Sequence, residues 1–443
     1  MARDHVVVLG GGSTGEAFVS ALREYEPDTP ITLVERELVG GECSYWACMP
    51  TKGMLRPLEA VAAARNVPGA AEAVSGDVSW DGVLRHRDAI TGGWDDASQA
   101  SWLASKHAEL VRGEGRVAEP GVVDAGGRRL EYGRLVIATG SVPSVPPVPG
   151  LAETGYWTNR EATAVREIPA SLIVLGAGPV GCELAQFFRR MGSTVSMVDV
   201  AERLLPREHG DAGALLGRFF EEEGIALHLG EPVERIEPGI RLHRGSGDVV
   251  EAERLLVATG RRANASGFGF EQLGVTTGRS GIRVDDRMRA GDGVWAIGDV
   301  NGIAMFTHAG KYQARIAAAD MAGRPAHADH RAVPAVTFTD PQVASVGVTS
   351  GDGLVTGERA IDQVSRTSTY ERPKRPGFLK VAADPERGVL VGAVAVGPEA
   401  GEWLGQLTLA VRAEVPLAVL RDTIQPYPTF SEAIQFALRD LPL

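Results

Sequence analysis

An apolar run leads directly into a glycine-rich turn in the stretch Val6-Val7-Val8-Leu9-Gly10-Gly11-Gly12-Ser13-Thr14-Gly15. The apolar run predicts a short buried strand, and residues 17–23 predict a helix behind the turn. A second apolar run, residues 31–34, ends on Glu35. This order predicts a βαβ nucleotide-binding unit, because the glycines let the backbone approach a pyrophosphate and the helix N-terminus stabilises its charge. Glu35 is then placed to accept ribose hydroxyls.

The same order recurs later in the chain. Residues 171–175 predict a strand, Gly176-Ala177-Gly178-Pro179-Val180-Gly181 a turn, and the following residues a helix to about Met191. Residues 195–198 then predict a strand that ends on Asp199. A lone G-x-G-x-x-G also occurs in ordinary turns, but each copy here has the strand, helix and terminal acid that the mechanism requires. The sequence therefore predicts two bound dinucleotides.

The acid at the end of the second unit indicates which nicotinamide cofactor is used. The carboxylate of Asp199 is expected to pair with free ribose hydroxyls and to repel a 2′-phosphate. We therefore predict a preference for NADH over NADPH. Arg203 and Arg207 follow closely and are long enough to reach a phosphate, so the alternative stays open.

Two further segments resemble each other, Leu135-Val136-Ile137-Ala138-Thr139-Gly140 and Leu256-Val257-Ala258-Thr259-Gly260. Each is predicted to be a late strand of its nucleotide unit. The first lies much further from its glycine-rich turn than the second does, so the first unit carries an insertion. Four prolines within residues 143–149 then stiffen the exit from that unit and predict a domain boundary near residue 150.

The insertion contains a cysteine pair in Gly40-Gly41-Glu42-Cys43-Ser44-Tyr45-Trp46-Ala47-Cys48-Met49-Pro50-Thr51-Lys52. Two thiols this close in sequence can open and close a disulfide and so store two electrons. Pro50 suits the first turn of a helix, and a helix N-terminus stabilises a thiolate. A structural disulfide or two buried thiols is the alternative interpretation. The neighbouring nucleotide motifs favour redox activity.

Composition excludes several function classes. The 443 residues are 44% hydrophobic and 23% charged, which is typical of a globular protein with two to four domains. The formal charge of −12 and the absence of a basic stripe argue against nucleic-acid binding. No apolar run is long enough to span a bilayer, so we expect no membrane partner. A strand predicted from residue 6 leaves no room for a signal peptide, and we expect a cytoplasmic location.

Together these motifs resemble those of the class I pyridine nucleotide–disulfide oxidoreductases, the flavoprotein family of dihydrolipoamide dehydrogenase, glutathione reductase and mercuric reductase. Gly260-Arg261-Arg262-Ala263-Asn264 resembles the family's G-R-x-P-N, and Trp295-Ala296-Ile297-Gly298-Asp299-Val300 its second FAD motif. The resemblance covers essentially the whole chain. It implies an α/β fold with two Rossmann-like dinucleotide-binding domains, for FAD and NAD, and a C-terminal α+β dimerisation domain.

The resemblance also implies domain boundaries and cofactor sites. The domains would be residues 1–149 for FAD with the redox disulfide, 150–265 for NAD(P), 266–331 for the second FAD or central part, and 332–443 for dimerisation. The implied FAD-binding residues are Gly10, Gly12, Gly15, Glu35, Thr139, Gly140, Asp299, His308 and Ala309, and the NAD-binding residues are Gly176, Gly178, Gly181, Asp199 and Gly260. Asp299 would bind the ribityl chain, although without the resemblance a turn or capping carboxylate is the preferred interpretation. Thr307-His308-Ala309 would open a helix that faces the flavin.

The resemblance assigns catalytic roles as well. Cys48 would be the thiol next to the flavin, and Cys43 the interchange thiol that faces the substrate. Lys52 and Glu183 would form a pair beside the flavin N5 and stabilise negative charge there. Without the resemblance, each would be interpreted as an ordinary solvated charge on a helix.

One motif departs from the family pattern. Relatives that handle dithiols carry H-P-T-L-S-E near the C-terminus, with the His as proton carrier and the Glu orienting it. The corresponding segment here is Tyr427-Pro428-Thr429-Phe430-Ser431-Glu432. Tyrosine is a poor proton acceptor near neutral pH, so Tyr427 argues against an ordinary dihydrolipoamide dehydrogenase or glutathione reductase. The chain also ends without the C-terminal cysteine pair expected of a mercuric reductase.

The leading prediction is a homodimeric FAD enzyme that oxidises NADH and passes electrons through Cys43 and Cys48 to a small disulfide or thiol-reactive acceptor. Direct transfer from flavin to a quinone-type acceptor is the alternative that Tyr427 supports. A non-catalytic, FAD-loaded subunit of a larger complex is a third possibility. No metal site is predicted. Tyr45, Trp46 and Tyr427 would make the substrate pocket aromatic, or would simply pack against helices.

Overall fold

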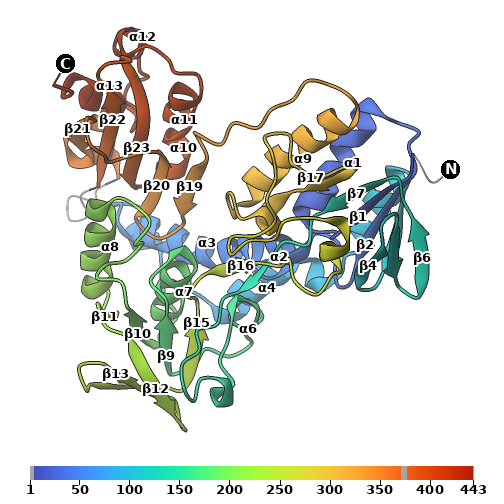
Figure 1. The fold of residues 1–443 in the computed structure, drawn as a ribbon. Helices are drawn as coiled ribbons and strands as arrows, with labels where there is room; N and C mark the ends of the chain where they lie inside the picture. The colour runs from blue at the N-terminus through green and yellow to red at the C-terminus, as the bar shows by residue number, and fades with distance from the viewer. Residues whose placement is uncertain (1–3, 371–376, 443) are drawn as a thin grey trace. The chain divides into compact units, whose positions relative to one another are not determined.

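The computed structural model describes residues 4–370 and 377–442. The chain divides into two compact units. The first unit consists of residues 1–50, 87–144 and 261–329, and the second of residues 51–86, 145–260 and 330–443. Figure 1 gives the labels of the helices and strands in both units.

The first unit is built on a six-stranded sheet in the order β17-β18-β7-β1-β2-β3. The strand β1 (Val6–Leu9) pairs in parallel with β2 (Ile31–Glu35) on one side and with β7 (Arg134–Ile137) on the other. All four residues of β1 are buried, which explains why this strand is an unbroken apolar run. The remaining strands of this sheet are β3 (Ala108–Arg112), β17 (Arg289–Gly291) and β18 (Val294–Ala296).

Helices α1 (Ser13–Tyr25) and α9 (Thr307–Met321) lie side by side in the first unit (Figure 1). Their apolar residues form one core with β1 and β2, including Phe18, Leu22 and Ala314. The unit also contains α2 (Gly41–Tyr45), α5 (Ala97–Ser105), the three-stranded sheet β4 (Gly115–Glu119), β5 (Val122–Ala125) and β6 (Arg128–Glu131), and the pair β8 (Ser141–Pro143) and β16 (Arg261–Ala263). Helices α3 (Cys48–Arg65) and α4 (Trp80–Ile90) begin in one unit and end in the other.

The second unit repeats the nucleotide-binding topology. Its four-stranded sheet has the order β11-β10-β9-β15, and all neighbours are parallel. The strands are β9 (Ser171–Leu175), β10 (Thr194–Asp199), β11 (Ala226–Leu229) and β15 (Arg254–Val257), and the helices α6 (Asn159–Thr163), α7 (Pro179–Arg190) and α8 (Gly210–Glu222). An antiparallel sheet of β12 (Val233–Glu237), β13 (Arg241–Arg244) and β14 (Val249–Glu251) is inserted before β15.

The C-terminal part of the second unit is a five-stranded antiparallel sheet in the order β19-β20-β23-β22-β21. Its strands are β19 (Pro334–Thr337), β20 (Gln342–Gly347), β21 (Val355–Ala360), β22 (Phe378–Asp384) and β23 (Val389–Gly397). The helices α10 (Ala400–Trp403), α11 (Gly405–Arg412), α12 (Leu417–Asp422) and α13 (Glu432–Arg439) pack against it (Figure 1). This is the α+β arrangement expected for the C-terminal region.

The predicted strands and turns are confirmed, with one difference at the helix starts. Both glycine-rich motifs were expected to be turns throughout, but α1 already begins at Ser13 and α7 at Pro179. The third glycine of each motif therefore lies inside the first helical turn. The residue Pro50 lies in the first turn of α3, as expected. Within the described ranges, no helix is both long and apolar enough to cross a membrane.

Candidate cofactor and thiol sites

The two glycine-rich turns are held in the same way. In the first unit the Gly11 N–H donates to Glu35 Oε2 at 2.8 Å. In the second unit the Ala177 N–H donates to Asp199 Oδ2 at 2.6 Å. The acid that ends the second strand therefore stabilises the turn after the first, and each carboxylate stands at the carboxyl edge of its sheet, where dinucleotides bind in this topology. The contacts from Glu35 and Asp199 back to the turns were not predicted.

Glycine is required where helix and strand approach closely. A β-carbon on Gly15 would lie 2.1 Å from the Gly10 carbonyl oxygen, and one on Gly181 would lie 2.0 Å from that of Gly176. By contrast, a β-carbon on Gly140, Gly178 or Gly260 would meet no heavy atom within 4 Å. Open space therefore remains beside these three residues, which fits the dinucleotides that the motifs predict. Gly12 is the residue directly before α1. The amides at the N-terminus of this helix are available to face a phosphate.

Cys43 and Cys48 are both partly buried and lie together in the first unit. The pKa of the Cys43 thiol is raised, first by its hydrogen bond with Cys48 and then by burial. The hydroxyls of Thr307 and Ser13 oppose this rise. Thr307 Oγ1 also lies 3.6 Å from Cys48 Sγ. The first residues of α1 and α9 thus bring hydroxyls to the cysteine pair, an arrangement that the spacing in sequence does not reveal.

Asp299 is held by a short polar chain in the same unit. The Ser141 hydroxyl donates to Asp299 Oδ2 at 2.6 Å, and Arg261 Nε donates to the same hydroxyl oxygen at 2.7 Å. Arg261 Nη2 lies 3.6 Å from the carboxylate of Glu42, next to Cys43. Burial raises the pKa of the Asp299 carboxyl, while Ser141 and Arg261 oppose the rise. The arginine of the G-R-x-P-N-like motif therefore holds the second FAD motif, a link the sequence did not predict.

The other predicted FAD residues lie on the same unit. The Thr139 hydroxyl donates to the Asn264 carbonyl oxygen at 2.7 Å. Thr307 is the first residue of α9, as predicted, and Ala309 is buried in its first turn. The ring of His308 stacks on Phe306 with 5.2 Å between centroids. His308 is therefore an exposed aromatic neighbour of the helix start.

Lys52 and Glu183 meet in the second unit. Lys52 Nζ donates to Glu183 Oε2 at 2.6 Å, and the Phe338 N–H donates to Glu183 Oε1 at 2.9 Å. Lys52 Nζ also lies 4.8 Å from the centroid of the Phe338 ring. The side chain of Glu183 is 5% exposed and that of Lys52 is 33% exposed, so the buried carboxylate has a partner on each oxygen. The predicted pair is thus present, but the contribution of Phe338 was not foreseen.

Tyr427 and Glu432 lie near the C-terminus of the second unit. Tyr427 is 73% exposed, and Ile424 nearby is 93% exposed. Glu432 Oε2 accepts the Thr429 N–H at 3.3 Å, a contact between the first residue of α13 and the segment before the helix. No group of three or more His, Cys, Asp or Glu residues suited to a metal ion occurs among the described residues.

The family follows from comparison with known proteins. Residues 4–323 match the family described as pyridine nucleotide-disulphide oxidoreductase. The chain belongs to this family. Residues 333–438 match the dimerisation domain of the same pyridine nucleotide-disulphide oxidoreductases, which supports a homodimer. The α/β fold with FAD- and NAD-binding regions and a C-terminal dimerisation domain is therefore confirmed.

Two curated relatives illustrate the range of pyridine nucleotide-disulphide oxidoreductases that the chain resembles. The mercuric reductase of Acidithiobacillus ferrooxidans is 34% identical over 452 residues, covering 98% of this chain and 82% of the relative. The dihydrolipoyl dehydrogenase of Chlorobaculum tepidum is 34% identical over 466 residues, covering 99% of this chain and 97% of the relative. These relatives are flavin-dependent disulfide oxidoreductases, so the chain is an enzyme of this class.

Solved structures of similar oxidoreductases share the fold. LpdA from Mycobacterium tuberculosis has a TM-score of 0.87 and 26% sequence identity, with 98% of this chain and 99% of that chain covered. The flavoprotein disulfide reductase RclA from Escherichia coli has a TM-score of 0.85 at 23% identity, which shows the fold alone, over 98% of this chain and 99% of that chain. The family binds FAD and NAD(P)H, in agreement with the two glycine-rich turns.

Proposed function

We propose that this enzyme oxidises NADH and passes the electrons through FAD to the Cys43–Cys48 pair, and from there to a small disulfide or thiol-reactive acceptor. The observation that carries the proposal is the placement of both thiols within hydrogen-bonding reach of each other, against the hydroxyls of Ser13 and Thr307. For a disulfide acceptor, NADH, one proton and one disulfide give NAD⁺ and two thiols. FAD, when bound, supplies the two-electron link between the nicotinamide and the cysteines.

The residues of the chain take the following proposed roles. Cys43 attacks the acceptor, and Cys48 then closes the disulfide and releases the reduced product. Lys52 stands four residues after Cys48 on α3, and its ammonium, held by Glu183, stabilises negative charge at the cofactor. The carboxylate of Asp299, buried and held by Ser141, would accept a hydrogen bond from a ribityl hydroxyl of bound FAD.

The predicted cofactor preference and domain limits remain part of the proposal. The Asp199 side chain, anchored by the Ala177 and Ala201 N–H groups, favours free ribose hydroxyls and hence NADH. Glycines of both turns approach the pyrophosphates. The domain boundaries at residues 149, 265 and 331 and the cytoplasmic location stay predictions from the sequence.

A second candidate function is direct reduction of a quinone-type acceptor by the flavin. Tyr427 supports this candidate, because it occupies the position where dithiol-handling relatives carry a proton-carrying histidine. A reaction that bypasses the thiols needs no proton carrier on the thiol face.

The experiment that separates the two functions compares the natural protein with Cys43→Ser. NADH oxidation is measured against disulfides, thiol-reactive compounds and quinones, and flavin bleaching by NADH is followed by stopped flow. We expect Cys43→Ser to retain flavin bleaching and to lose turnover with disulfides. Cys182→Ala, which removes the third cysteine from a buried site on α7, is the control and keeps disulfide turnover. Unchanged turnover in Cys43→Ser would refute the thiol route and favour the quinone function.

A further inference from the structure

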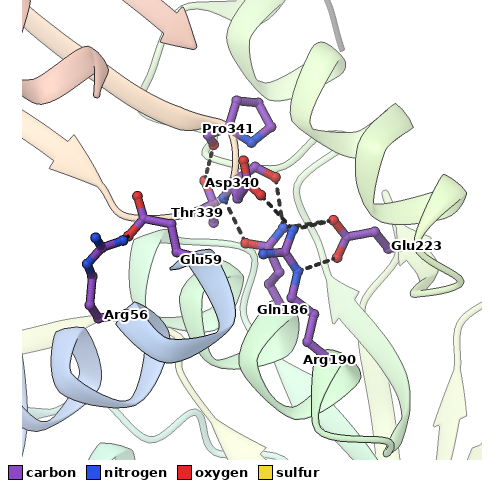
Figure 2. A network of polar contacts seen from close by, with 8 residues as sticks. All are labelled: Arg56, Glu59, Gln186, Arg190, Glu223, Thr339, Asp340 and Pro341. Carbon is purple, nitrogen blue, oxygen red and sulfur yellow. Dashed lines mark hydrogen bonds and ion pairs between the residues drawn. The ribbon is translucent and has the colours of Figure 1, made fainter. Parts of the chain in front are cut away.

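One face of helix α7 carries a row of polar side chains that contact a single turn. Glu183, Gln186 and Arg190 are spaced by three and four residues, so they project from the same face of the helix. Their contacts fall on residues 338–341, which connect β19 to β20 and are called the 338–341 turn below. Figure 2 shows Gln186 and Arg190 facing Asp340 of this turn.

Gln186 pairs with the backbone of the turn at two points. The Asp340 N–H donates to Gln186 Oε1 at 2.8 Å, and Gln186 Nε2 donates to the Asp340 carbonyl oxygen at 3.0 Å. This is the double hydrogen bond that two neighbouring strands exchange, made here by one amide side chain. Gln186 is 1% exposed and Asp340 is 8% exposed. Removing the amide would therefore take a hydrogen-bond partner away from two buried backbone groups of the turn.

Arg190 holds the same turn through charge. Its Nη2 lies 3.0 Å from Asp340 Oδ2 and 2.7 Å from Glu223 Oε1, and its Nε donates to Glu223 Oε2 at 3.1 Å. Gln186 Nε2 also reaches Glu223 Oε1 at 3.2 Å. The Glu223 carboxylate is thus shared between the Arg190 guanidinium and the Gln186 amide, and the Asp340 carboxylate pairs with the guanidinium (Figure 2). Both the backbone and the side chain of Asp340 are therefore fixed relative to α7.

The 338–341 turn also determines how the Glu183 carboxylate is held. The Phe338 N–H occupies Glu183 Oε1, which leaves Oε2 for Lys52 Nζ. Thr339 reinforces the turn, since its hydroxyl donates to the Pro341 carbonyl oxygen at 2.7 Å. Displacement of the turn would therefore withdraw the Phe338 N–H, release the Glu183 carboxylate and free the Lys52 ammonium to change position.

We propose that Gln186, assisted by Arg190, is a positioning residue that fixes the 338–341 turn so that Phe338 and Glu183 hold the Lys52 ammonium in place. This deepens the proposed function and rests on it, because Lys52 is assigned there to stabilise charge at bound FAD. A purely structural role for Gln186 predicts lower stability alone. A positioning role predicts a change in the FAD midpoint potential in addition.

The test compares the FAD-loaded natural protein with FAD-loaded variants. Gln186→Met keeps the length of the side chain and removes both hydrogen bonds to Asp340. We expect the FAD midpoint potential to become more negative, and flavin reduction at saturating NADH to slow by roughly tenfold with little change in NADH affinity. Lys380→Met is the control, because Lys380 of β22 pairs with Asp211 of α8 and so joins the same two regions without touching the turn. The FAD midpoint potential of Lys380→Met should equal that of the natural protein.

A double-mutant cycle establishes whether Gln186 acts through Lys52. In a Lys52→Met background, Gln186→Met should shift the potential no further. A full additional shift in that background, or an unchanged potential in the single variant, would overturn the inference. If Gln186→Met does not fold, Arg190→Lys takes its place, since lysine cannot bridge Asp340 and Glu223 with the same fork. An unchanged potential in that variant would likewise overturn it.

These measurements need no electron acceptor. A natural protein whose flavin is not reduced by NADH would contradict the proposed function itself. Normal reduction in the natural protein, with no effect of the Gln186 substitution, would contradict the positioning role alone. The two failures are therefore distinguishable.

Discussion

Lys52 and Glu183 are 131 residues apart in the chain, yet Lys52 Nζ lies 2.6 Å from Glu183 Oε2 in the second unit. Helix α3 supplies the ammonium and helix α7 the carboxylate. The side chain of Glu183 is almost completely buried, and its second oxygen accepts the Phe338 N–H. The pair therefore joins three regions of the sequence, and it has consequences for stability as well as for catalysis.

Replacing Lys52 should destabilise the protein, because a buried carboxylate would lose its charged partner. We expect Lys52→Met to lower the free energy of unfolding by about 1–3 kcal/mol, as measured by urea denaturation. Arg56→Met is the matched control on the same helix. Arg56 pairs with Glu59 (Figure 2), and both side chains are exposed, at 62% and 42%, so the loss of the pair should cost no more than about 0.5 kcal/mol. Equal effects of the two substitutions would contradict the buried-pair interpretation.

Glu16 should make the stability of the protein depend on pH. Burial raises the pKa of its carboxyl to about 7, although Lys311 opposes the rise, and the unfolded chain has the ordinary value near 4.5. The folded state therefore favours the neutral acid. This stabilisation is complete below about pH 4.5 and is lost as the pH rises through 7.

Glu16→Gln removes that dependence. We expect the variant to match the natural protein at pH 4 and to be more stable by about 2 kcal/mol at pH 8. Urea denaturation at the two pH values tests this. Glu24→Gln, at an exposed position of the same helix, should leave the free energy of unfolding unchanged at both pH values. A stability difference for Glu16→Gln that stays constant with pH would show that its carboxyl titrates normally.

The charge of Asp199 should determine nucleotide preference. The Ala177 N–H donates to Asp199 Oδ2 and the Ala201 N–H to Oδ1, so Asp199→Asn keeps an acceptor for one of the two N–H groups and removes the negative charge. We expect the ratio of kcat/KM for NADH over NADPH to fall by about tenfold, since repulsion of the 2′-phosphate is lost. Steady-state kinetics with both nucleotides measures it. If the natural protein already uses NADH and NADPH equally well, the Asp199 argument fails.

Tyr427 offers a test of the missing proton carrier. If proton transfer limits reaction with disulfides, Tyr427→His should raise kcat toward a disulfide substrate by about 10²-fold and introduce a pH optimum near neutrality. Tyr427→Phe, which lacks a titratable group, is the control and should show no gain. Because Tyr427 is largely exposed, neither substitution should alter stability appreciably. A histidine variant without improved turnover would assign the limitation to the substrate pocket instead.

Local features were predictable wherever one segment carries its own signal. The apolar runs of β1 and β9 are continuous because both strands are buried in parallel sheets, and the glycines mark backbone approaches that a side chain would block. Repetition of the whole βαβ order strengthened each prediction. The family comparison then confirmed the two dinucleotide-binding regions and the dimerisation domain.

Contacts between distant segments could not be predicted in this way. Hydrogen bonds from Phe338 to Glu183, from Ser141 to Asp299 and from Gln186 to Asp340 each join residues more than 150 positions apart. Their side-chain types are common on any surface, so no local pattern distinguishes them. The spacing of Glu183, Gln186 and Arg190 along α7 was the one available signal, and it shows a shared face without naming its partner.

Sequence alone was sufficient for the strands and helices around the two glycine-rich motifs, the duplicated nucleotide-binding topology, the family and the choice of the cysteine pair. These depend on period, burial and backbone conformation, which act over a few neighbouring residues. Tertiary structure alone decided which hydroxyls meet the thiols and how the Lys52–Glu183 pair is held. Those contacts depend on directional hydrogen bonds formed after distant segments pack, and the free energy of each is small beside the burial that brings the segments together.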